Sequence, residues 1–419
     1  MDIKNFKSGE ELYNEKLKRV HDCIELKVPD RVPIIPVMQG FIPFYGGITL
    51  EEALNDYDKA EGAFDKFYED FEPDLAWDPV LMYPVNAFKT WDLKWMRWPG
   101  HKGLGPNTMY QFLENENMTE DEYDELIFDP TSFIASKWIP RSFGNLGGFQ
   151  HLEKLRDSLW LGFFNSFFPF STKEMQQTFD SLIKGAEQMS AWYDFLARYS
   201  DKLKQKGFPV AWGAFAFAPF DMLGDTLRGT TEILFDLKDR PEKVLAAVDK
   251  LTPIAIESAI RGAAGTGRKF VWIWLHKGID EFMSDADYKT FYWPSLKKLI
   301  NGLIDAGLTP MLYGEGKLNS RLEIMRDVPK GKVVYHFEYV DMQRAKEVLG
   351  DVACISGNVP NSILHFGTVD EVKDYCKYLI DNCAKDGGFM MDTGGLLDDA
   401  KPENVKAMFD FTREYGRYL

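Results

Sequence analysis

Short apolar runs alternate with helical segments over most of this chain, and this alternation restricts its fold more than any other feature. Runs begin at residues 33, 74, 208, 269, 309, 333, 353 and 388, and from residue 269 onward each is followed by helical periodicity. Strands that alternate with helices in this way pair in parallel through right-handed crossovers. Eight such units predict a (β/α)8 TIM-type barrel. A doubly wound open sheet is the alternative, but no Gly-x-Gly-x-x-Gly motif follows a strand.

The predicted domain organisation is one barrel with two additions. Residues 1–30 form an N-terminal helical extension, whose helix over residues 10–28 ends at Pro29 and Pro33. Residues 31–419 form a single barrel domain. Residues 86–149 within it read as an irregular insertion rich in Trp, Pro and Gly. So long an irregular stretch in a compact domain is more often a functional lid than a linker.

Charge and composition exclude several classes of function. A net charge of −16 argues against a nucleic-acid partner, which would need a basic stripe. No apolar run approaches the length of a membrane span and the N-terminus is polar, so we expect a cytoplasmic protein that does not bind membranes. The 4 cysteines are too few for a disulfide framework and lack CxxC spacing. The oligomeric state stays open, with a homodimer as one option.

Two neighbouring predicted strands end in groups that can bind a metal. Met311-Leu-Tyr-Gly-Glu-Gly316 presents Glu315, and Val333-Val-Tyr-His-Phe-Glu338 carries His336 and Glu338. The active site of a barrel lies at the carboxyl-terminal ends of its strands. Carboxylates and imidazole suit Zn²⁺, so these three residues are predicted metal ligands, with Glu338 either ligating or orienting His336. The alternatives are a surface salt bridge for Glu315 and a core position for His336.

Other residues near strand ends are candidates for catalysis or substrate binding. His276, in Leu-His-Lys-Gly, is a candidate to protonate a leaving oxygen or to bind a ring substituent, with a structural role in its loop as the alternative; Asp392 is a candidate third metal ligand or acid. Asp78 would hydrogen-bond the substrate or cap a helix. The candidate substrate-binding residues are Trp77, Trp212, Tyr313 and Asn358, although core packing for the aromatic residues and loop shaping by Asn358 are the alternatives.

Several motifs together resemble those of the uroporphyrinogen decarboxylase superfamily. They are Pro29-Asp-Arg-Val-Pro33, Leu227-Arg-Gly229, Leu275-His-Lys-Gly-Ile-Asp-Glu-Phe-Met-Ser284, Phe291-Tyr-Trp-Pro294, Ile355-Ser-Gly-Asn-Val-Pro360 and Phe366-Gly-Thr368. The superfamily includes the haem-pathway decarboxylase and corrinoid-dependent methyltransferases. The resemblance implies the same barrel that the strand pattern predicts.

The chain departs from two branches of that superfamily. The loop at residues 37–45 contains no Arg or Lys, where the decarboxylase has arginine to clamp substrate carboxylates. Thiol-methylating relatives hold zinc with a His-x-Cys pair and a later Cys; here Glu315 stands at the first Cys and Gly395 at the later one. Uroporphyrinogen and a thiol are therefore not the expected substrates.

The segments Trp98-Pro-Gly-His101 and Tyr110-Gln-Phe-Leu-Glu-Asn-Glu116 resemble ether-cleaving, corrinoid-dependent O-demethylase methyltransferases. This resemblance implies a zinc site without thiolates, a methoxylated aromatic substrate, and cob(I)alamin (cobalamin) on a partner corrinoid protein. The further Glu expected upstream of Glu315 is replaced by Ile300 and Asn301, which leaves the third ligand unassigned. Alternative hypotheses are another methyl donor (a methylamine, a methylthiol or an aliphatic ether), a metal-independent decarboxylase using Asp78 and His276, and a non-catalytic corrinoid-binding scaffold.

Overall fold

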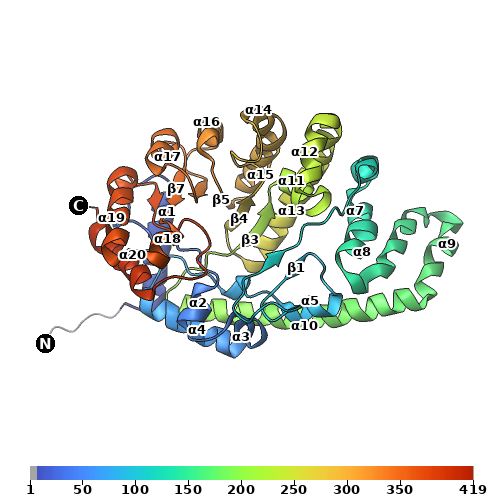
Figure 1. Ribbon diagram of the computed structural model, residues 1–419, viewed down its shortest axis with the longest axis horizontal. Coiled ribbons are helices and arrows are strands. Elements are labelled where there is room, and N and C mark those ends of the chain that lie inside the picture. The colour runs from blue at the N-terminus through green and yellow to red at the C-terminus, as the bar shows by residue number, and fades with distance from the viewer. Residues whose placement is uncertain (1–6, 419) are drawn as a thin grey trace.

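Six parallel strands form the central sheet of the computed structural model, which describes residues 7–418 (Figure 1). They are β3 (Ala214–Phe217), β4 (Phe270–Leu275), β5 (Thr309–Gly314), β6 (Val334–Phe337), β7 (Cys354–Gly357) and β8 (Phe389–Met390). Their spatial order equals their order in the chain, and every pairing is parallel. All side chains of β4 and β6 are buried, as expected for strands covered on both faces.

The first two predicted strands are shorter than expected. Ile34 bridges Met391 and Ala76 bridges Val210, both in parallel, and Asp74 N donates to the carbonyl of Ile34 at 2.8 Å. These bonds place residues 33–35 and 74–76 between β8 and the segment that leads into β3, where the first two strands of a (β/α)8 barrel belong. Prolines explain the shortening, because Pro33 and Pro36 lack an N–H donor and residues 79–81 turn into a 3₁₀ helix at Pro79.

Helices cover the outside of this sheet. Those that follow the later strands are α13 (Pro241–Thr266), α15 (Trp293–Asp305), α16 (Leu322–Met325), α17 (Met342–Leu349), α19 (Val369–Leu379) and α20 (Pro402–Tyr415). The N-terminal extension is α1 (Gly9–Ile24), whose first turn is stabilised by a capping box between Ser8 and Glu11. The predicted barrel with a helical extension is thus confirmed. No helix among the described residues is long and apolar enough to cross a membrane.

The insertion is more regular than the sequence suggested. It contains α5 (Val85–Trp91), the antiparallel pair β1 (Met96–Arg97) and β2 (Gln111–Phe112), α6 (Tyr123–Phe128), α7 (Pro130–Phe133) and α8 (Ile139–Ser142). Short helices continue beyond residue 149 to α9 (Phe163–Phe167). The helix α10 (Lys173–Gln205) then runs along the lower edge of the molecule in Figure 1, from a helical lobe with α7, α8 and α9 back to the barrel.

The four cysteines are free and buried. Cys23 in α1 lies 3.7 Å from Cys354 in β7, sulfur to sulfur, and donates to the carbonyl of Phe389 at 3.1 Å. These thiols therefore pack the extension against the sheet.

Candidate active site

His276 and Glu315 lie next to each other because β4 and β5 end side by side. Leu275 pairs with Gly314 in the sheet, so the residues that follow emerge together. His276 Nε2 is 3.4 Å from Glu315 Oε2, and the two side chains are 32% and 38% exposed. The flanking Gly314 leaves room for the side chain of Leu318, whose terminal methyl would lie 2.4 Å from a Cβ at this position. The site therefore opens to solvent at the carboxyl-terminal end of the barrel.

A second carboxylate fixes the orientation of His276. Asp225, in the helical segment η7 (Met222–Arg228), places Oδ2 2.6 Å from His276 Nδ1, and its Oδ1 lies 3.2 Å from Lys277 Nζ. Burial disfavours the imidazolium, but the bond to Asp225 and the nearby charges outweigh it and raise the pKa of His276 to about 9. Nδ1 is thus held by Asp225, and Nε2 is presented to Glu315.

The backbone of the His276 loop is anchored by Asp221. Its carboxylate accepts hydrogen bonds from the backbone N–H groups of His276 and Lys277, each at 3.0 Å, and from the Tyr292 hydroxyl at 2.7 Å. Burial and the charge of Asp225 raise the pKa of Asp221 to about 6. Because its oxygens already have three donors, Asp221 acts as an anchor of the loop.

Glu338 completes a group of facing carboxylates. It accepts a hydrogen bond from Gly316 N at 3.0 Å, and a Cβ on Gly395 would lie 2.9 Å from its Oε1. The carboxylate of Glu338 thus fills the space where the resemblance expects a later Cys or His. Burial, and then the charges of Glu338 and Asp225, raise the pKa of Glu315, while His276 opposes this change. The structure therefore brings the predicted residues Glu315 and Glu338 together.

His336 has a different environment from the one predicted. Its Nδ1 lies 3.0 Å from Asp392 Oδ2, and its Nε2 donates to the carbonyl oxygen of Gly394 at 2.8 Å. The ring is 2% exposed and stacks on Tyr313 with centroids 4.0 Å apart. Asp392 is fully buried and also accepts from Val37 N at 3.0 Å. In this arrangement neither nitrogen of His336 is available to a metal, and Asp392 is not exposed as an acid.

Two other predicted residues, Asp78 and Asn358, are held by hydrogen bonds that do not involve the side chains of His276 or Glu315. Asp78 is buried, and its Oδ2 accepts from Ser200 at 2.9 Å and from Arg268, which precedes β4, at 3.1 Å. Within residues 7–418, no hydrogen bond or ion pair joins Asp78 to His276, the two residues that the decarboxylase hypothesis combines. Asn358 donates to the carbonyls of Glu338 and Val340, at 3.1 and 2.9 Å, and so shapes its loop.

The predicted aromatic residues belong to one packed cluster inside the barrel. Trp77 lies 4.5 Å from Trp272 between ring centroids, and 5.8 Å from the half-buried Trp212. Tyr313 is fully buried, and its hydroxyl has no partner among the described residues. Core packing, the alternative reading of these aromatic residues, therefore describes Trp77, whereas substrate binding by Tyr313 stays a prediction.

Sequence reasoning missed the partners of His276. Asp221 and Asp225 are four residues apart, a spacing that places two side chains on one helix face, and this was the available signal. Ligand atoms of Asp221, Asp225 and His276 lie within 4.8 Å of one another. Tyr83, just before the insertion, was also missed. Burial, with a contribution from the charge of Glu315, raises its pKa to about 12, and its ring lies 4.9 Å from that of Tyr110.

Comparison with known proteins identifies the family. A family model described as uroporphyrinogen decarboxylase (URO-D) matches residues 169–415. The uroporphyrinogen decarboxylases of Citrifermentans bemidjiense and Syntrophotalea carbinolica are 28% and 26% identical, over 42% and 41% of this chain and 50% and 48% of theirs, so the chain spans about half the length of these relatives. A methyltransferase from Methanosarcina mazei, 15% identical, superimposes over 98% of this chain and 99% of its own with a TM-score of 0.63, which shows a shared fold. The chain belongs to the uroporphyrinogen decarboxylase family.

Proposed function

We propose that this protein is a methyltransferase that removes the methyl group from a methoxylated aromatic compound and transfers it to cob(I)alamin on a separate corrinoid protein. The observation that carries the proposal is the pair of His276 and Glu315, 3.4 Å apart at the mouth of the barrel, with Glu338 beside them. A substrate with several carboxylates would meet negative charge here, and residues 37–45 supply no cation. Burying such a substrate would be costly, so a neutral ether fits the site better.

Carboxylate and imidazole donors suit a zinc ion. The ligand atoms of Glu315, Glu338 and His276 do not all lie within 4.8 Å of one another, so zinc binding would draw these side chains closer together. Within residues 7–418, the ion pair with His276 is the one that the Glu315 carboxylate forms. Oxygen atoms of Glu315 therefore remain free to bind a metal ion. We assign Zn²⁺ to Glu315, Glu338 and Nε2 of His276, which replaces His336 as the imidazole ligand. Hydrogen bonding of the other ring nitrogen to a carboxylate, as Asp225 provides, is the usual support of a zinc-binding histidine. When bound, zinc supplies Lewis-acid stabilisation of the negative charge that develops on the ether oxygen.

The protein side chains have defined tasks in this proposal. Asp225 fixes the ring of His276, Asp221 holds its loop, and the aromatic rings of Tyr83 and Tyr110 offer an apolar surface near Glu315 for an aromatic substrate. In this proposal the methyl group would pass from the ether oxygen to the reduced corrinoid of the partner protein, and the freed oxygen would take up one proton from solvent. The corrinoid protein would dock at the exposed end of the barrel.

A metal-independent decarboxylase or lyase is the second candidate, and the protonation state of His276 favours it. With a pKa of about 9, this imidazole carries a proton at neutral pH and can act as a general acid. The relatives named as decarboxylases are consistent with this reading.

One set of measurements separates the candidates. Zinc is quantified in the purified protein, and transfer of methyl groups from a panel of methoxyarenes, methylamines and methylthiols to cob(I)alamin is followed by absorbance. We expect about one zinc per chain, and at least a hundredfold lower transfer in Glu315→Gln with loss of the zinc. The matched control is Glu323→Gln, since Glu323 forms an exposed ion pair with Arg344. Full activity of metal-free protein, or no transfer from any donor with zinc bound, would contradict the proposal.

A further inference from the structure

A hollow of about 810 Å³ lies at the amino-terminal end of the barrel, opposite His276 and Glu315. Its walls come from α1, from Asp30 and Arg31 before the first strand segment, from the end of α4 (Tyr57–Phe71), from Phe208 and from the last turn of α20. Pockets for small molecules in proteins have volumes of roughly 300–1,000 Å³. The hollow therefore has room for a metabolite in addition to water.

The lining of the hollow has more cationic than anionic side chains, although the chain as a whole has a net charge of −16. The anionic lining residues are Glu15, Asp30, Glu69 and Glu72, and the cationic ones are Lys16, Arg19, Arg31, Lys206, Arg413 and Arg417. An excess of cations inside one concave surface of an acidic protein attracts anions locally.

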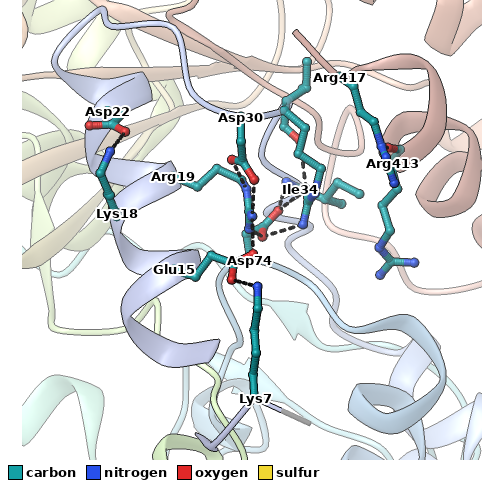
Figure 2. A network of polar contacts seen from close by, with 12 residues as sticks. Lys7, Glu15, Lys18, Arg19, Asp22, Asp30, Ile34, Asp74, Arg413 and Arg417 are labelled. Carbon is teal, nitrogen blue, oxygen red and sulfur yellow. Dashed lines mark hydrogen bonds and ion pairs between the residues drawn. The ribbon is translucent and has the colours of Figure 1, made fainter. Parts of the chain in front are cut away.

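Most of these cations already have partners. Arg19 bonds Asp30 and Asp74, each at 2.6 Å, and Arg31 bonds Asp74 at 2.7 Å; Figure 2 shows this network beside Arg413 and Arg417. Arg417 donates from Nε to a backbone carbonyl at 3.2 Å but has no carboxylate partner among residues 7–418. Arg417 therefore keeps donors for a ligand.

Lys16 is the most unusual member of the lining. Its side chain is only 9% exposed, and within residues 7–418 no carboxylate or other acceptor bonds its Nζ. The ammonium lies 3.6 Å from the ring centroid of Phe208, a cation–π contact that offsets part of the cost of burial. The Nζ atom itself is not fully buried, so it can be reached from the hollow, and charged groups on residues this buried are ordinarily paired with a counter-ion.

The electrostatic surroundings of Lys16 agree with a missing counter-ion. The pKa of Lys16 is lowered to about 8: burial is the main cause, the charges of Asp74 and Glu72 oppose it, and those of Arg31 and Arg413 add to it. An anion placed beside Nζ would stabilise the charged form and reverse this shift.

We propose that this hollow binds a small metabolite through its phosphate group, with Lys16 as the buried contact and Arg417 at the entrance. The size of the hollow exceeds what a bare ion needs, and an ammonium combined with a guanidinium is a common means of binding phosphate. The ligand would connect α1 with α20 at the end of the barrel away from the catalytic face, so the site is independent of the proposed methyl transfer.

Isothermal titration calorimetry of the full chain with inorganic phosphate tests the proposal. Lys16→Met removes the buried ammonium and keeps the apolar stem, so it should fold, as circular dichroism will verify. The matched control is Lys18→Met on the same helix, because Lys18 is 75% exposed and pairs with Asp22 away from the hollow (Figure 2). We expect Lys16→Met to weaken binding about tenfold or more, and Lys18→Met to change it less than about twofold. No binding below about 10 mM, or equal losses in both variants, would overturn the proposal.

A second titration uses sulfate, whose charge does not change between pH 6 and pH 9. Because the unbound protein loses the charge of Lys16 above pH 8, sulfate should bind about tenfold more weakly per pH unit beyond that point in the native chain and in Lys18→Met. Lys16→Met should lack this dependence. A native chain whose sulfate affinity stays constant across this range would exclude Lys16 as the contact.

Discussion

His276 and His336 are both close to strand ends, and their hydrogen bonds assign them different roles. The nitrogens of His336 bond Asp392 and the carbonyl of Gly394 inside the protein, whereas His276 directs Nε2 toward the partly exposed Glu315. We therefore predict that His336→Gln destabilises the protein by about 1–3 kcal/mol, the cost of unpaired buried groups, and leaves the zinc content unchanged. Urea unfolding and metal analysis check this. Loss of zinc at unchanged stability would restore His336 as a ligand.

From the hydrogen bond between Asp225 and His276 we predict how the stability of the metal-free protein depends on pH. The folded pKa of His276, about 9, is above its ordinary value of 6.5, so the pair stabilises the fold fully below pH 6.5 and loses this effect as pH rises through 9. Asp225→Asn should lower the imidazole pKa and cost about 1–2 kcal/mol at pH 6.5, after allowance for solvent screening. The unfolding free energy of Asp225→Asn should approach that of the native protein near pH 10. NMR titration of the imidazole and urea unfolding measure both; a pH-independent difference would contradict the assignment.

The site residues show where prediction from sequence succeeds and where it stops. Glu315 was found because a carboxylate between two glycines at a strand end has no packing role. The environment of His336 was not predictable, because Gly394 and Asp392 lie more than fifty residues away in the chain and their hydrogen bonds depend on the final packing. Asp225 was missed because η7 is a helical segment between strands, where no apolar run draws attention to a polar residue.

At the scale of elements, the later strands matched the prediction closely and the first two did not. Apolar runs such as residues 309–313 need only burial to become strands, and β5 spans Thr309–Gly314. Residues 33–38 and 74–82 contain prolines that interrupt pairing, so specific polar contacts hold them in place. The chief contact is the fully buried Asp74, which accepts from Arg19, Arg31 and the backbone N–H of Ile34 (Figure 2).

This network predicts a large effect of one substitution. Asp74→Asn would leave Arg19 and Arg31 without their buried carboxylate, and the expected loss is about 3–5 kcal/mol of unfolding free energy. The control is again Glu323→Gln, whose exposed pair with Arg344 should be worth less than about 1 kcal/mol. Urea unfolding of both variants measures the difference. Similar values for the two would mean that α1 and the second strand segment are held by apolar packing alone.

At the scale of the whole molecule, the helical lobe differs from the barrel in how its large apolar residues are covered. In the barrel Trp272 is 1% exposed, whereas in the lobe Leu159, Trp160 and Phe168 are 86%, 89% and 73% exposed. Residues 159–171, which carry these side chains, lie at the far end of α10 from the barrel (Figure 1) and form short helices. Exposed segments with few buried apolar groups open at low free energy, so proteases reach them first.

Chymotrypsin, which cuts after aromatic residues, should therefore cleave first between residues 159 and 168, where exposed aromatic residues lie in consecutive short helices. Exposed barrel aromatics such as Phe235 and Phe366 should be cut later, because the helices that carry them also bury apolar residues in the barrel core. Mass spectrometry over time identifies the first cuts. Replacing Trp160, Phe164 and Phe168 by Ser should slow this cleavage and leave the urea midpoint of the barrel unchanged, since these side chains bury little surface. Protection that appears only at high protein concentration would indicate that a second copy covers the segment, as a homodimer would. First cuts within β3 to β8 at every concentration would show instead that the barrel, and not the lobe, is the less stable part of the molecule.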